Sequence, residues 1–162
     1  MRRFLLASLL TALLAPACGG DDAGGEAVPT GPAREAAVYA AIVLHVAETI
    51  ELEEGRNPES RTVYVEPSDP DRSIPLEVQA GVVQWVEGQV TVDFIDQRRA
   101  AVLVDDPGQP VREGTALLAL GTVPDGHLRV DVDVRRYFKE GEEERVRYAL
   151  RRVGREWRVN QS

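Results

Sequence analysis

Asp131 and Asp133 form the carboxylate pair whose spacing comes nearest to catalytic chemistry. They stand two residues apart in an alternating segment, so both point to one face of a strand, where paired carboxylates can exchange protons or hold a cation. Arginines surround them, which favours cross-strand ion pairs on a solvated face, worth about 0.2–1 kcal/mol each. The arginines that flank the pair or can lie on the adjacent strand are Arg129, Arg135, Arg147 and Arg151. We therefore predict a structural role for both aspartates.

The remaining reactive residue types do not gather into a recognised motif. His45 and His127 are far apart in the chain, whereas a zinc site normally needs three or four ligands from His, Cys and carboxylates. The sequence contains neither a Gly-x-Ser-x-Gly nucleophile motif nor a phosphate-cradling glycine motif. It therefore predicts no catalytic residue, no metal site and no cofactor.

Four aromatic residues are the best candidates for lining a ligand pocket: Trp85, Phe94, Tyr148 and Trp157. In that hypothesis Asp93, beside Phe94, is the nearest acid or base. The same aromatic residues also fit ordinary core positions, because they alternate with polar neighbours. We favour the core positions, and the pattern identifies no small-molecule ligand.

The charge balance limits the classes of partner. The 162 residues include 19 basic and 27 acidic side chains, for a net charge of −8. Such a balance argues against a surface for nucleic acid or for anionic lipid, and the sequence shows no basic cluster with interleaved aromatic residues. We predict no nucleic-acid partner.

The first eighteen residues have the layout of an export signal. Met1-Arg2-Arg3 is basic, residues 4–14 are mostly apolar, and Ala15-Pro16-Ala17 supplies small residues before Cys18. The apolar run is too short to span a membrane, which takes about 20 residues. We predict that residues 1–17 are a signal peptide, cleaved between Ala17 and Cys18.

The segment Leu14-Ala15-Pro16-Ala17-Cys18 resembles the lipobox of bacterial lipoproteins, although Ala15 stands where that family usually has Leu. The resemblance implies that Cys18 becomes the lipidated first residue of a protein anchored in the cell membrane or the outer membrane. Cys18 is also the only cysteine, so a lipid accounts for a thiol that has no partner for an internal disulfide. Ala15-Pro16-Ala17 equally fits ordinary signal cleavage, which leaves free secretion or a periplasmic location open.

Residues 18–32 and 33–162 differ in composition. The first segment is rich in Gly, Asp and Pro and lacks apolar periodicity, which predicts a flexible linker behind the lipidated cysteine. The second has the usual length of one domain. Its patterning predicts helices over residues 33–54 and 73–87, with Gly55 and Ser73 as caps. Strands are expected over residues 61–66, 90–95, 101–104, 115–123, 128–138, 145–153 and 156–159.

These elements predict an α+β fold, with a long N-terminal helix and a short second helix packed on a curved antiparallel sheet. Residues 115–123 are almost wholly apolar and should form a central strand buried on both faces. The arrangement resembles a cystatin-like or NTF2-like roll. Residues 38–45 resemble the first helix of an uncharacterised group of bacterial exported proteins, and residues 148–159 resemble their last hairpin and that of NTF2-like domains. The resemblance brings no known activity with it.

Two main functional hypotheses follow for a membrane-anchored protein of this kind. One is a non-catalytic binding or interaction module with an envelope protein as partner, which needs a filled core and an exposed patch. The alternative is an NTF2-like hydrolase or isomerase for a small apolar substrate, which needs an enclosed cavity containing a carboxylate or tyrosine of shifted pKa. A purely structural role in an envelope complex is a third hypothesis.

Overall fold

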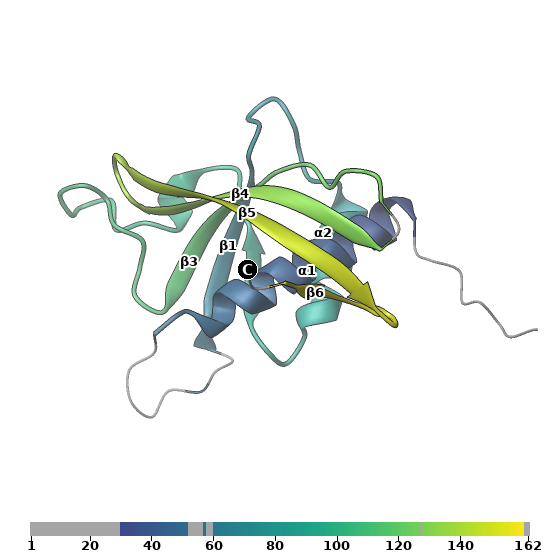
Figure 1. The fold of residues 1–162 in the computed structure, drawn as a ribbon. Coiled ribbons are helices and arrows are strands. Elements are labelled where there is room, and N and C mark those ends of the chain that lie inside the picture. Colours follow the sequence, from purple (N-terminus) through teal and green to yellow (C-terminus); the bar gives the residue numbers. More distant parts are fainter. Residues whose placement is uncertain (1–29, 52–56, 58–59, 127, 161–162) are drawn as a thin grey trace, which may run out of the picture.

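Two helices pack on one side of a strongly curled six-stranded sheet (Figure 1). The computed structural model describes residues 30–51, 57, 60–126 and 128–160. The helices are α1 (Gly31–Glu48) and α2 (Leu76–Val86). The strands are β1 (Thr62–Pro67), β2 (Thr91–Phe94), β3 (Thr115–Leu120), β4 (Arg129–Lys139), β5 (Glu142–Val153) and β6 (Glu156–Val159).

The sheet is mixed, with strand order β2-β1-β3-β4-β5-β6. Strand β1 runs parallel to both β2 and β3, whereas every later neighbour is antiparallel. The predicted α+β class is confirmed, but the expectation of an antiparallel sheet is wrong for these two pairs. The reason is the position of α2 between β1 and β2 in the chain, because a helical crossover returns the chain to the end of the sheet where β1 begins.

Helix α1 fills the concave side of the sheet. Its residues Val38, Tyr39, Ile42, Val43 and Val46 are all 0% exposed, because apolar side chains cover most of its circumference and the sheet curves around them. The helix ends at Glu48, well before the predicted residue 54. Thr49 caps it, and its hydroxyl donates to the carbonyl of Val46 at 2.7 Å. The predicted cap at Gly55 lies outside the described residues.

Helix α2 packs directly against α1. It begins at Leu76 with Pro75 as its N-cap, so the predicted cap at Ser73 is wrong. The two helices approach closely at Gly81, where an added Cβ would lie only 2.7 Å from the Cβ of Ala36. The absence of a side chain at Gly81 therefore sets the spacing of the helix pair.

The prediction that β3 is buried on both faces is confirmed. Leu118 packs in the main core beneath α1, while Leu117 belongs to a second cluster on the opposite face. Chain segment 95–112 covers that cluster and contributes Ile95, Ala101 and Val102 to it. The predicted strand over residues 101–104 is therefore wrong. Only an isolated bridge between Val102 and Val111 forms there, since the apolar side chains of this segment cover the sheet instead of extending it.

The C-terminal hairpin is confirmed. Strands β5 and β6 pair through a tight turn that contains Gly154, whose φ is +62°. Strand β5 begins three residues earlier than predicted, because Gly141 adopts φ +77° and lets the chain turn directly from β4 into β5. In the described part of the chain, no helix is both long and apolar enough to cross a membrane.

The Gly81–Ala36 approach gives a testable prediction. Gly81→Ala should destabilise the protein by about 1 kcal/mol, because overpacking at 2.7 Å outweighs the roughly 1 kcal/mol gain in helix propensity. In an Ala36→Gly background the same substitution should be neutral or stabilising. Urea unfolding of the four proteins measures the coupling, and equal effects of Gly81→Ala in both backgrounds would contradict the close-contact explanation.

Candidate functional site

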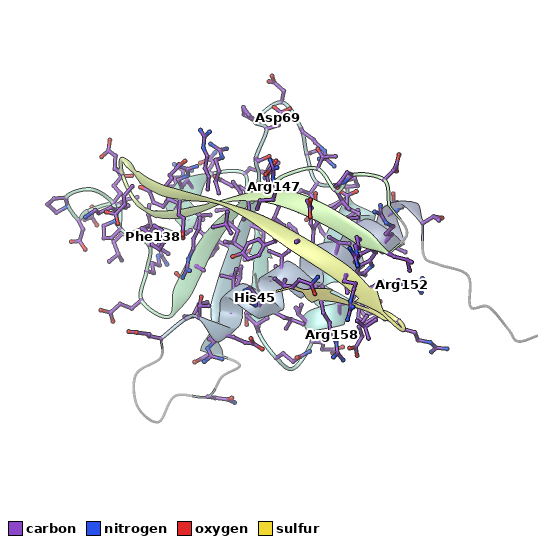
Figure 2. All side chains as sticks on the ribbon, viewed as in Figure 1. His45, Asp69, Phe138, Arg147, Arg152 and Arg158 are labelled. Atoms are coloured by element: carbon purple, nitrogen blue, oxygen red, sulfur yellow. The ribbon has the colours of Figure 1, made fainter. Side chains whose placement is uncertain are left out.

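The structure confirms a cross-strand ion pair at the predicted carboxylate pair. Asp133 lies opposite Arg147 on the neighbouring strand, and the Nε of Arg147 donates to Asp133 Oδ1 at 2.7 Å. Asp131 is exposed and lies opposite Ala149. Figure 2 shows Arg147 on the outer surface of the sheet, away from α1. The pair therefore belongs to the solvated face.

A groove of about 880 Å³ opens at the carboxyl ends of the parallel strands β1 and β2. We call it the arginine groove, after Arg72, Arg98 and Arg135, which line it together with Glu66 and Phe94. The carboxyl ends of parallel strands are a frequent place for ligand binding in sheets with helical crossovers. Sequence reasoning missed this groove, because its arginines come from a loop, a 3₁₀ turn and a distant strand.

Arg98 is the centre of the polar network in the arginine groove. Its guanidinium bonds Glu66 at 2.5 Å and Glu143 at 2.9 Å, and it lies 4.6 Å from the ring centroid of Tyr137. The hydrogen bond to Glu66 is the main reason why the pKa of Arg98 rises above its ordinary value. Arg135 also approaches Glu143, at 3.7 Å, and donates to the carbonyl of Ser68. The arginines of this groove are thus held by carboxylates.

A second polar contact joins α1 to the loops beside the arginine groove. Arg72 bonds Glu35 at 2.8 Å and the hydroxyl of Thr122 at 2.6 Å. Nearby, the buried hydroxyl of Tyr39 donates to the carbonyl of Gly121 at 2.7 Å. Burial, reinforced by the charge of Glu35, raises the pKa of Tyr39 far above its usual range. Tyr39 therefore stays protonated and fastens α1 to the end of β3.

A groove of about 520 Å³ lies between α1, the end of α2 and β6. We call it the tryptophan groove, because Trp85 and Trp157 both line it. Trp85 is 46% exposed, whereas Trp157 is 6% exposed. The α1 residues at its surface include Ala37, Ala40, Ala41, Leu44 and His45. The small side chains of Ala37, Ala40 and Ala41 on this face of α1 leave room for an approaching backbone.

The other sequence candidates are dispersed. The rings of His45 and Tyr148 meet edge to face at a centroid distance of 5.6 Å, and His45 lies in the last turn of α1 (Figure 2). Phe94 lines the arginine groove. Asp93, the proposed acid or base, is exposed on edge strand β2, on the face opposite to Phe94. The four aromatic residues therefore do not form one pocket.

The predicted processing and lipidation residues, Ala17 and Cys18, lie outside the described residues, as does His127. Within the part of the chain that the structure describes, no group of three or more His, Cys, Asp or Glu side chains is placed to hold a metal ion.

Comparison of the chain with protein-family models, with curated proteins and with solved structures found no match. The residues of the two grooves therefore provide the basis for inferring a function.

The Arg98 network predicts a clear contrast between two arginines. Arg98→Met should lower the free energy of unfolding by about 1–2 kcal/mol, since it removes two ion pairs and a cation–π contact. The matched variant Arg147→Met breaks a solvated pair and should leave the stability unchanged within error. Urea unfolding in low and high salt measures the change in the free energy of unfolding for both variants. Equal losses in the two variants would show that the network adds nothing beyond an ordinary surface pair.

Proposed function

We propose that this chain is an exported lipoprotein, held at the cell membrane or outer membrane by a lipid on Cys18, whose roll domain of cystatin- or NTF2-like type is a non-catalytic binding module. The main support for a non-catalytic role is that α1 occupies the concave side of the sheet, the side where a roll would otherwise enclose a substrate. Val38, Tyr39 and Ile42 have no exposed surface there. The two grooves are open to solvent instead, which suits recognition of a partner at the surface.

The tryptophan groove is the part of the surface best suited to a protein partner. Trp85 presents a large, rigid side chain there, and tryptophan and arginine are the residue types that most often dominate binding energy at interfaces. Its other wall is β6, the last strand of the sheet. A partner can therefore contact an aromatic side chain and a strand edge at the same time.

The pairing of β6 with β5 leaves main-chain groups at that edge. The N–H of Asn160 donates to the carbonyl of Ala149 at 2.8 Å, and bonded residues alternate along an antiparallel pair. Trp157 and Val159 therefore direct their N–H and C=O groups away from β5. An extended segment of a partner protein can add to this edge as a further strand. Glu156 and Arg158, which form an ion pair with each other at 2.9 Å, can also pair with a basic and an acidic residue, respectively, in the facing positions.

The proposed anchor is supported by the composition of the N-terminal region. Cys18 is the only cysteine, and residues 19–29 separate it from the described domain. A flexible chain of that length spans about 20 Å, enough to carry a domain clear of lipid headgroups. Two acyl chains attach a protein stably, because each buried methylene contributes about 0.8 kcal/mol.

The anchor is tested by the mass of the mature N-terminus. We expect the membrane fraction to contain a chain that starts at Cys18 and carries a diacyl adduct on its thiol. Cys18→Ser should abolish the adduct and release the domain from membranes. Intact-mass spectrometry measures the mass of the mature chain and of any adduct. An unmodified thiol, or a mature chain that starts elsewhere, would refute lipidation.

The binding surface is tested by crosslinking in native membranes followed by purification and peptide mapping. Wild-type protein should retain a partner through crosslinks that map to β6, and Trp85→Ala should reduce its yield at least tenfold. Leu128→Ala is the matched control, because Leu128 is 64% exposed and lines neither groove. The assignment of partner binding to the tryptophan groove would be contradicted if Trp85→Ala left the partner's yield unchanged. Crosslinks confined to the arginine groove would contradict it as well.

A further inference from the structure

Arg34 is a buried cation without an anionic partner among the described residues. It is the fourth residue of α1 and only 8% exposed. One guanidinium nitrogen donates to the carbonyl of Pro124 at 2.6 Å, and the group lies 5.7 Å from the ring centroid of Trp157. Its Nε has no hydrogen-bond partner, and no carboxylate forms an ion pair with Arg34 among the described residues. Burial of an uncompensated charge is costly, so this arrangement calls for an explanation.

Arg152, a half-buried residue, has an unpartnered Nε beside the same tryptophan. That nitrogen is buried, as the Nε of Arg34 is. Arg152 stands opposite Trp157 in the β5–β6 register and shares a face of β5 with the buried Leu150. Trp157 is therefore a neighbour of both arginines. Figure 2 shows Arg152 toward the end of the sheet near the start of α1.

The N-terminus of α1 adds a third positive feature at this end of the molecule. Thr30 makes no side-chain cap, and the first turn contains no acidic residue, so the N–H groups of Gly31 and Ala33 have no partner within the helix. The helix dipole places partial positive charge there. Side chains of a helix tilt toward its N-terminus, which sets the guanidinium of Arg34 beside this turn. Asp125, next to Pro124, is exposed and forms no ion pair with Arg34 in the described structure.

We propose that Arg34, Arg152 and the first turn of α1 form a binding site for one carboxylate or phosphate anion beside Trp157. Such an anion accepts hydrogen bonds from the two guanidinium groups and from the first-turn N–H groups that have no partner within the helix. Two sources fit this chemistry. One is a soluble ligand, and the other is the chain itself, which carries Asp21, Asp22 and Glu26 before α1.

The test titrates inorganic phosphate and, separately, acetate into the full-length chain in detergent at constant ionic strength. Trp85→Phe makes Trp157 the single tryptophan, so its fluorescence reports on the site, and thermal unfolding gives a second readout. A soluble ligand predicts a saturable response that Arg34→Gln and Arg152→Gln each weaken at least tenfold. Arg151→Gln is the matched control, since Arg151 is an exposed neighbour on the opposite face of β5 and should leave binding unchanged.

The second arm removes the chain's own carboxylates through Asp21→Asn, Asp22→Asn and Glu26→Gln together. If these residues supply the anion, only this variant should respond to phosphate or acetate, and Arg34→Gln should abolish that response. Absence of a saturable response in both chains would overturn the proposal. So would a response that persists in both Arg34→Gln and Arg152→Gln. Neither result bears on the partner-binding role of Trp85, which is tested independently.

Discussion

The packing of α1 into the concave side of the curled sheet is the constraint on which the rest of the structure depends. A helix with apolar side chains around most of its circumference cannot remain at the surface, and a six-stranded sheet with a strong curl offers the concave face that covers it. The second helix then has to pack against the first at short range, which requires the bare backbone of Gly81. Tyr39 completes the arrangement by bonding a carbonyl at the end of β3 from within the core.

Because α1 fills the concave face, the proposed binding surface lies at the periphery. The arginine groove forms where the parallel strands end, and its charges are compensated by carboxylates from β1 and β5. The tryptophan groove forms where α1 emerges beside the last strand, and there the exposed groups are an aromatic side chain and a strand edge. The difference in charge pairing explains why we assign stability to the first groove and partner binding to the second.

Arg34 and Arg98 illustrate two ways in which a guanidinium is held. Arg98 is surrounded by two carboxylates and an aromatic ring, so its positive charge is compensated within the fold. Among the described residues, Arg34 contacts only a carbonyl and a ring in this way, and both carry partial charges. The proposed anion site combines Arg152 of β5 with the first turn of α1, where the proposed lipid-anchored linker joins the described domain. Occupancy of the site and the position of the linker would therefore both act on the same turn of α1.

Local sequence patterns determined much of this protein. The apolar circumference of α1, the two-faced burial of β3, the hairpin of β5 and β6 and the ion pair of Asp133 with Arg147 all follow from periodicity and near neighbours. Only the tertiary structure decided that β1 pairs in parallel with both neighbours, and that chain segment 95–112 covers the sheet instead of joining it. It also brought Arg34 to a carbonyl 90 residues away. The physical reason is that periodicity indicates which side of an element is buried. Which strands pair, and which groups surround a buried charge, depend instead on contacts between segments far apart in the chain.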